Sequence, residues 1–304
     1  MWKKEPRAVG IDPTVDYAFK KMLGNPQYPE ITLHFLNALL DPASPIREVE
    51  IIDPILGKEF EEDKLSILDI RATDQANRQL NIEVQRSKHD GLAERLAYYV
   101  SSLYTGQLGE GHDYVHLNPA IGICVLDDLL FPELGDLHLD FRLRSAKTGI
   151  CLTDRLEIHL LELPKYILPS DNAAIRDPIE QWCFFFRRVK DLASEEVPRY
   201  LPAPEFTQAT GILEMIARSP EEREQYEARL KLQRDEAWKL AAARREGEVE
   251  GRVEGEKRGK LLGQIEALGS ILETPCENLA EQSDDALVSL LNDLQRRVSE
   301  RGIG

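Results

Sequence analysis

The sequence predicts an α/β protein with a central mixed β-sheet flanked by helices, followed by a C-terminal helical region. Helical and strand-like patterns alternate along roughly the first 165 residues. The strand-like segments include one nearly continuous apolar run and several alternating runs, which are typical of buried and half-exposed strands respectively. From about residue 210 the chain is charged, favours helix and is poor in strand formers.

Four segments of the first 200 residues are predicted to be helical, because apolar residues recur in them three or four positions apart. Residues 14–24 and 29–40 precede every strand, and the first of them ends at a glycine, a common helix stop. Residues 91–108 lie between strand-like segments, and residues 178–192 follow the last of these. This order is typical of helices that cover a sheet.

Six segments are predicted to be strands. Residues 120–127 (AIGICVLD) are apolar almost throughout, which indicates a strand buried on both faces. Residues 136–144 alternate strictly and predict a half-exposed strand with one apolar face. The remaining segments are residues 49–56, about 65–73, about 79–86 and 155–163. The pair at 65–86 is expected to form an antiparallel hairpin.

Composition restricts the class of protein. The chain has 304 residues, 42% of them hydrophobic, which suits a soluble globular protein. Its net charge of −16 is spread over both halves and counts against a general nucleic-acid surface, although a local basic rim can sit on an acidic protein. No apolar run is long enough for a membrane span, and the first residues lack a signal-peptide pattern. We therefore expect no membrane association.

The cysteines indicate the compartment. Cys124, Cys151, Cys183 and Cys276 are far apart in the sequence, with no CxxC pair. This spacing favours reduced thiols over a zinc ribbon or a disulfide framework. We expect a cytoplasmic protein.

The last third of the chain contains a glycine repeat with a period of four. Its members are Gly247, Gly251, Gly255, Gly259 and Gly263. A glycine inside a helix costs about 1 kcal/mol relative to alanine. The repeat is either a close helix–helix contact along a stripe of small residues, or a weakly helical spacer or loosely oligomerising helix. Without a bilayer to favour close contacts through such a stripe, the second interpretation is preferred. Residues 284–298 predict a short amphipathic helix.

Two acidic residues interrupt the strands of the predicted hairpin. If the turn is centred on Ala76, Asp69 directly faces Glu83. Directly opposed Cβ atoms lie about 4.5–5.5 Å apart, and like charges at such positions are destabilising. A divalent cation between the carboxylates would remove the repulsion. The alternative is a solvent-facing hairpin in which Arg71 or Arg78 pairs with the acids, and spacing alone favours that alternative.

A resemblance to a known family favours the metal site over the solvent-facing hairpin. The blocks DYAFKKMLG, DKLSILDI, NIEVQ, ERLAYYVSSLYTGQLGEGHDY and AIGICVLDDLLF occur in this order over residues 12–131. Together they resemble the PD-(D/E)XK nuclease family transposases, also called recombination-promoting nucleases. The resemblance implies a restriction-endonuclease-like core, and the proline-rich stretch at 197–206 indicates a boundary, so we expect the nuclease-like domain over residues 1–200. A charged helical C-terminal region over residues 201–304, with its glycine repeat, is also typical of that family.

The resemblance also implies a set of site residues. Asp69 and Glu83 would be metal ligands, with the Val84 carbonyl as an additional one, for Mg²⁺ or Mn²⁺. Gln85 stands where many related nucleases have lysine, and would orient the attacking water or a phosphate oxygen. Asp16 matches the acidic residue that such nucleases place beside the hairpin, although its spacing equally fits an exposed helix acid.

DNA contacts are expected beside these residues. The candidates are Lys20, Arg86, Lys88, Arg95 and Tyr98. Arg95 and Tyr98, or its neighbour Tyr99, match the family's pattern on the helix after the hairpin. Tyr99 shares a face with leucines and is expected in the core, and Lys20 can instead pair with Asp16 four residues away.

The first functional hypothesis is a Mg²⁺-dependent DNA endonuclease of the recombination-promoting or transposase-associated type, in which the metal assists phosphodiester hydrolysis. The alternative is a catalytically weak or inactive nuclease-like scaffold that binds DNA or a partner. A third hypothesis, a self-associating helical adaptor, lacks a sustained heptad pattern. The expected partners are DNA and a second copy of the chain, bound through the C-terminal helical tail.

Overall fold

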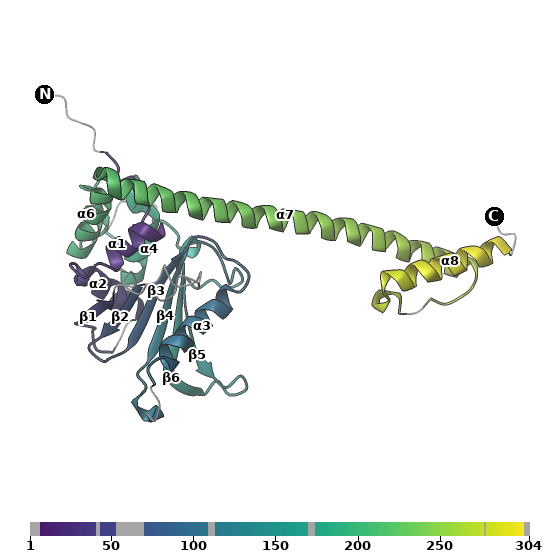
Figure 1. Cartoon of the computed structure of the whole chain (residues 1–304), viewed down its shortest axis with the longest axis horizontal. Coiled ribbons are helices and arrows are strands. Elements are labelled where there is room, and N and C mark those ends of the chain that lie inside the picture. Colours follow the sequence, from purple (N-terminus) through teal and green to yellow (C-terminus); the bar gives the residue numbers. More distant parts are fainter. Residues whose placement is uncertain are drawn as a thin grey trace. The chain divides into compact units, whose positions relative to one another are not determined.

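The computed structural model describes residues 7–40, 43–52, 70–108, 113–169, 174–276 and 278–300, and the chain divides into two compact units, Met1–Asp235 and Glu236–Gly304. The helices are α1 (Asp16–Leu23), α2 (Pro29–Leu40), α3 (Leu92–Thr105), α4 (Pro178–Arg188), α5 (Val197–Tyr200), α6 (Pro204–Arg218), α7 (Pro220–Ile271) and α8 (Asp284–Glu300) (Figure 1). The strands are β1 (Val49–Ile52), β2 (Ile70–Asp74), β3 (Gln79–Gln85), β4 (Ala120–Leu126), β5 (His138–Arg144) and β6 (Cys151–Glu162).

The strands form one mixed sheet in the order β1-β2-β3-β4-β6-β5. The central strands β3, β4 and β6 are parallel, and the outer pairs β1–β2, β2–β3 and β5–β6 are antiparallel. Parallel neighbours need a crossover connection, and α3 lies in the crossover between β3 and β4. The predicted α/β fold with a mixed sheet is therefore confirmed, and so is the hairpin formed by β2 and β3.

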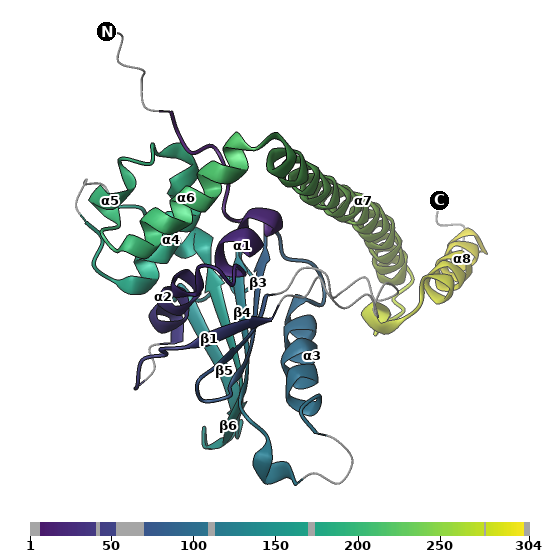
Figure 2. The same ribbon diagram turned by 60° about the vertical axis from the view of Figure 1, so that its left-hand side comes forward.

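Helices cover both faces of the sheet (Figure 2). On one face α1, α2 and α4 build the larger core, to which the β4 residue Ile123 contributes. On the other face α3 packs on Cys124 and Leu160 through Leu92 and Leu96. Every residue of β4 is buried, as its apolar run predicted. Neighbouring residues of β3 and β4 therefore point into two different cores.

Aromatic side chains fill the centre of the larger core. The Trp182 ring of α4 lies 5.3 Å from Phe35 of α2 and 4.8 Å from Phe206 of α6, measured between ring centroids. Trp182 is 1% exposed, and its indole N–H donates to His34 Nδ1 at 3.1 Å. Burying such large side chains contributes strongly to stability. The helix α6 thus belongs to the same core as the sheet.

The strand β5 is more exposed than its alternating pattern predicted. It lies at the edge of the sheet, and all residues from Asp140 to Arg144 are exposed, on both faces. On the face that was predicted to be apolar and buried, Phe141 is 39% exposed and Leu143 is 47% exposed. The pairing of β5 with β6 also shifts register around Leu143. Such irregularities increase the twist of a strand. Here they occur where the residues of the hairpin become exposed.

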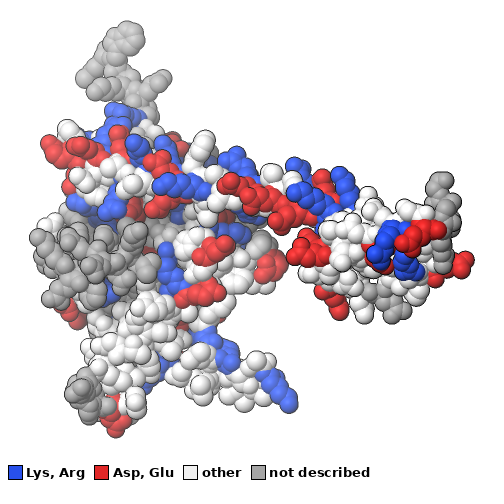
Figure 3. Space-filling model, turned by 45° about the vertical axis from the view of Figure 1, so that its right-hand side comes forward, with Lys and Arg blue, Asp and Glu red and all other residues white. Residues whose placement is uncertain are grey.

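The glycine repeat lies inside α7, which is helical from Pro220 to Ile271. A Cβ atom placed on any of the five glycines would meet no atom within 4 Å. Among the residues that the structure describes, nothing packs closely on this stripe, so the chain itself supplies no close helix–helix contact there. Positive and negative side chains are interspersed along the exposed surface of this helix (Figure 3).

The predicted terminal helix is present as α8. Its residues Leu287, Leu291 and Leu294 are buried together with Ile265 near the end of α7, in a core of their own within the second unit. The helix therefore packs back on the end of α7. Among the described residues no helix is both long enough and apolar enough to cross a membrane.

Candidate active site

The hairpin of β2 and β3 has the register that the sequence predicted. Ile70 pairs with Ile82 and Ala72 with Leu80, so the hairpin is centred on Ala76. Asp69 lies outside the described residues, and its pairing with Glu83 stays a prediction.

The turn of this hairpin is stabilised by Asp74, a residue that sequence reasoning missed. Its Oδ1 accepts hydrogen bonds from the backbone N–H of Ala76 at 3.0 Å and of Arg78 at 2.9 Å. Its Oδ2 accepts from Arg78 Nε at 2.6 Å. Asn77 takes a positive φ of 59°, which asparagine tolerates better than most residues. Arg78 thus pairs with Asp74 at the turn.

Glu83 lies at the centre of the candidate site. It is only 2% exposed and is aligned with Cys124 of β4, so it faces α3. Its Oε2 accepts from the Gln85 amide Nε2 at 3.3 Å and lies 3.5 Å from Arg95 Nη2. A buried carboxylate needs such compensation, because desolvation of an isolated charge costs several kcal/mol. The structure therefore brings three predicted site residues together: Glu83, Gln85 and Arg95.

Arg95, which was predicted to contact DNA, also contacts the Glu83 carboxylate inside the protein. Its side chain is 20% exposed and is directed at Glu83 from the first turns of α3. Its guanidinium carbon lies 5.9 Å from the centre of the Tyr99 ring, one helical turn along. Tyr98, by contrast, is 62% exposed and points away from the core. Of the two neighbouring tyrosines, Tyr98 is the one placed to meet a ligand in solution, and Tyr99 supports Arg95.

Val84 points away from Glu83, into the larger core, and is 5% exposed. It is aligned with Val125 of β4. Its predicted role concerns only the carbonyl oxygen, and that role stays a prediction.

Asp16 is a buried residue and not an exposed helix acid. It is 5% exposed and begins α1, where its Oδ1 accepts from the Tyr17 N–H at 2.8 Å. Its Oδ2 lies 3.9 Å from Arg229 Nε of α7. The helix α1 packs on the face of the sheet opposite to α3. The proximity of Asp16 to Glu83 stays a prediction. Lys20, one turn further along α1, is half-buried.

Arg86 belongs to an ionic cluster that no local sequence pattern indicates. Asp12 Oδ2 lies 2.8 Å from Lys190 Nζ and 3.5 Å from Arg86 Nη1. Burial alone would raise the pKa of Asp12, but hydrogen bonds from Lys190 and Thr14 outweigh it and hold that pKa below its ordinary value. Burial also raises the pKa of the nearby Asp127, partly offset by Arg86. These residues come from four separate segments, so only the fold brings them together.

Lys88 lies just beyond Arg86 and is half-buried. Its backbone N–H donates to Asp128 Oδ2 at 2.9 Å, which ties the end of β3 to the end of β4. Of the predicted DNA candidates, Tyr98 is exposed, Lys20 and Lys88 are half-buried, and Arg86 and Arg95 contact carboxylates.

The donors of the candidate metal site suit a hard cation. Carboxylate and carbonyl oxygens are the ligands that Mg²⁺ and Mn²⁺ prefer, and Glu83 supplies one buried carboxylate. Within the described part of the chain, no group of three or more His, Cys, Asp and Glu side chains could hold a metal ion. The predicted second carboxylate, Asp69, lies outside that part, so the donor chemistry fits and the complete ligand set stays a prediction.

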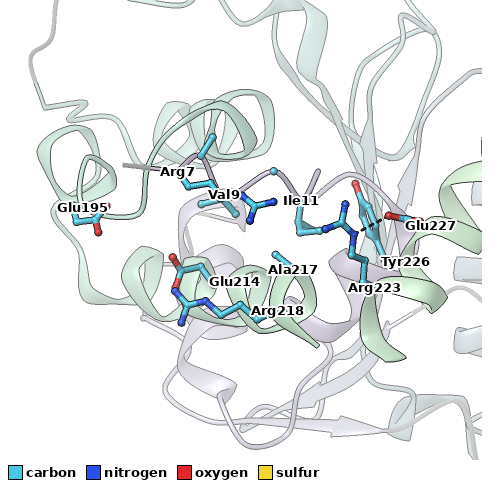
Figure 4. A pocket seen from close by; sticks show the side chains of 12 residues that line it. Arg7, Val9, Ile11, Glu195, Glu214, Ala217, Arg218, Arg223, Tyr226 and Glu227 are labelled. Carbon is cyan, nitrogen blue, oxygen red and sulfur yellow. Dashed lines mark hydrogen bonds and ion pairs between the residues drawn. The ribbon is translucent and has the colours of Figure 1, made fainter. Parts of the chain in front are cut away.

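A separate hollow of about 390 Å³ lies between the N-terminal segment, α6 and the start of α7 (Figure 4). Of its three arginines, Arg218 and Arg223 pair with Glu214 and Glu227, each at 2.8 Å, and Arg7 and Glu195 complete the charged lining. Paired charges of this kind leave little net field for a charged ligand. The hollow contains none of the predicted site residues.

The fold defines a restriction-endonuclease-like α/β core. Comparison with protein families identifies it further, since residues 13–243 match the model of the PD-(D/E)XK nuclease family transposases. The match covers more than half of the chain, which therefore belongs to that family. Membership indicates a nuclease-type function. No curated protein and no solved structure matches the chain.

Proposed function

We propose that the protein is a metal-dependent DNA endonuclease of the recombination-promoting type, acting in the cytoplasm. The observation that carries this proposal is the buried Glu83 carboxylate, contacted by Gln85 and Arg95, on a hairpin whose register is the one predicted for a paired-carboxylate site. Family membership supplies the reaction class.

Asp69, Glu83 and the Val84 carbonyl would hold the divalent cation, Mg²⁺ or Mn²⁺. When bound, such a cation polarises the scissile phosphate and lowers the pKa of a water molecule. Gln85 positions the Glu83 carboxylate by donating its amide hydrogen, and this leaves the amide oxygen to accept a hydrogen bond from water. Arg95 compensates the negative charge of Glu83 at the same oxygen, Oε2. Asp16, buried at the start of α1, is proposed to assist from the edge of the site.

The positive side chains around the hairpin end are proposed to bind the DNA backbone. Lys20 and Lys88 do so from the surface, and Tyr98 offers an exposed ring and hydroxyl. Arg86 lies 3.5 Å from Asp12, longer than a tight charge-assisted contact. A phosphate can therefore compete with Asp12 for Arg86.

The proposal predicts metal-dependent nicking of supercoiled plasmid DNA that EDTA abolishes. Glu83→Gln is expected to reduce nicking to the EDTA level, because the substitution removes a ligand charge. Gln85→Ala is expected to lower the rate by about 10–100-fold, as for other residues that position a metal ligand. Glu94→Gln, an exposed change on α3, is the matched control and should cleave like the wild type. Nicking that survives both EDTA and Glu83→Gln would contradict the proposal.

A second function is favoured by one specific observation. Gln85 carries no charge, and the Glu83 carboxylate is already compensated by Arg95. Both features suit a nuclease-like scaffold with little or no activity that binds DNA or a partner. This function is supported if the wild type binds DNA but nicks no plasmid with either Mg²⁺ or Mn²⁺.

A further inference from the structure

The hairpin of β5 and β6 forms an ordered arm, which we define as residues 141–152. Every residue of the arm is exposed. Its turn is closed by backbone hydrogen bonds from Ser145 N–H to the Ile150 carbonyl and from Gly149 N–H to the Ser145 carbonyl, both at 2.8 Å. Gly149 has a φ of +72°, a conformation that favours glycine. The arm therefore has a defined shape although no described residue covers it (Figure 1).

The charge of the arm is opposite to that of the chain. It contains Arg142, Arg144 and Lys147 and no acidic residue, whereas the whole chain has a net charge of −16. Arg142 is paired with Glu157 at 3.3 Å. Arg144 reaches only the Gly149 carbonyl, at 3.5 Å, and Lys147 makes no ion pair with any residue that the structure describes. Two cations are therefore available to an anionic partner.

Large apolar side chains accompany these cations. Leu143, Ile150 and Leu152 are 47%, 69% and 82% exposed. In Figure 3 the protrusion formed by this hairpin carries Lys and Arg atoms among uncharged ones. A two-stranded ribbon has dimensions that a DNA groove admits, and exposed apolar residues on such ribbons contact sugars and base edges. The combination fits duplex DNA.

We propose that the arm is a second DNA-binding element, in which Arg144 and Lys147 contact phosphates and Ile150 and Leu152 contact the groove. This inference rests on the proposed DNA substrate and extends it. It assigns the arm a role in binding that is independent of the metal and of cleavage.

The distance from Glu83 to the arm can be estimated from the sheet register and compared with the length of one turn of duplex DNA. Glu83 is aligned with Cys124, which is aligned with Leu160 of β6. The arm ends at Leu152, eight residues before Leu160 on the same strand. At about 3.3 Å per residue and about 4.8 Å for each of two strand spacings, a fully extended β6 gives a separation of at most about 28 Å. One turn of duplex DNA measures about 34 Å, so the arm meets the duplex within about one turn of the proposed cleavage centre.

The first test measures binding to a fluorescent duplex of several turns in EDTA, where no cleavage occurs. Arg144→Ala/Lys147→Ala is compared with Lys239→Ala/Arg252→Ala, which makes the same charge change on exposed positions of α7. The slope of log Kobs against log salt is negative, and each phosphate contact makes it steeper. Loss of two phosphate contacts is therefore expected to reduce the size of this slope by about 2, and only in the arm variant. Equal slopes in the two variants and the wild type would overturn the proposal.

The second test uses the exposed thiol of Cys151, which lies in the arm. Saturating duplex DNA is expected to slow alkylation of Cys151 by maleimide, while the partly exposed Cys276 of the second unit reacts at an unchanged rate and serves as the internal control. Protection of Cys151 by anionic lipid vesicles but not by DNA would overturn the proposal in favour of a membrane partner.

These tests separate the arm from the proposed enzyme. If the wild type nicks plasmid and the arm variant binds DNA normally, the arm proposal fails and the nuclease stands. If no divalent cation supports nicking but the arm variant still loses DNA binding, the nuclease proposal fails and the arm proposal stands.

Discussion

At the scale of single residues, the candidate site depends on Gln85. Sequence comparison raised the question of how a neutral side chain can stand where a lysine is common. In the structure the Gln85 amide donates to Glu83, and the positive charge next to that carboxylate comes from Arg95 of α3. A positive charge thus lies beside Glu83 although residue 85 carries none, and it comes from another element of the fold.

A buried histidine pair makes stability depend on pH. His138 Nε2 and His159 Nδ1 lie 3.0 Å apart, and burial together with the neighbouring His159 lowers the pKa of His138 from 6.5 to about 4. The unfolded chain binds this proton near pH 6.5 and the folded chain only near pH 4. Stability is therefore present above pH 6.5 and is lost as the pH falls toward about 4, with a slope of at most one proton.

The corresponding prediction is that His138→Leu loses less of its free energy of unfolding than the wild type over this pH range. Urea unfolding at several pH values measures the difference. His116→Leu, at an exposed position, should follow the wild-type curve. Parallel curves for the His138 variant and the wild type would show that the histidine pair does not cause the loss.

At the scale of elements, the start of α7 is part of the folded core. Tyr17 Oη donates to Glu222 at 2.7 Å, and Tyr226 is 5% exposed. The Tyr226 hydroxyl oxygen accepts from the Asp12 N–H at 3.0 Å. These contacts join the N-terminal segment to the first turns of α7. The family match, which extends to residue 243, includes them.

Removing the Tyr226 hydroxyl is expected to destabilise the first unit. Tyr226→Phe leaves the buried N–H of Asp12 without this acceptor, which costs about 1–3 kcal/mol of the free energy of unfolding. Tyr98→Phe removes the same atom from an exposed ring and should change stability little. Urea unfolding compares the two variants, and equal effects would mean that the Tyr226 contact is not used in solution.

At the scale of the whole molecule, the first unit and the helical tail differ in how much of their surface is buried. The first unit has a large core of its own, whereas most of α7 is exposed and its five glycines meet nothing within 4 Å. We propose that the tail acts as a spacer that also allows loose self-association.

This proposal predicts that Gly251→Ala/Gly255→Ala/Gly259→Ala stabilises the tail, because each added methyl group enters open space and raises helix propensity by about 1 kcal/mol. Circular dichroism at 222 nm during heating should show a later loss of helix. The oligomeric state, measured by light scattering, should not change. Dissociation of an oligomer in this variant would instead identify the glycine stripe as a close contact between copies.

Features that depend on local pattern could be predicted from the sequence. Most helices, the strands and the family follow from apolar periodicity and ordered motif blocks. The hairpin register was only a condition, a turn centred on Ala76, and the structure meets it with a short turn that Asp74 stabilises.

Only the tertiary structure decided which side chains meet. It brought Arg95 to Glu83, buried Asp16, joined Asp12 to Arg86 and Lys190, and left the arm uncovered although its strand pattern predicted one buried face. The physical reason is that periodicity reports which face of a segment is apolar. Whether another element reaches that face depends on where helices far away in the sequence end.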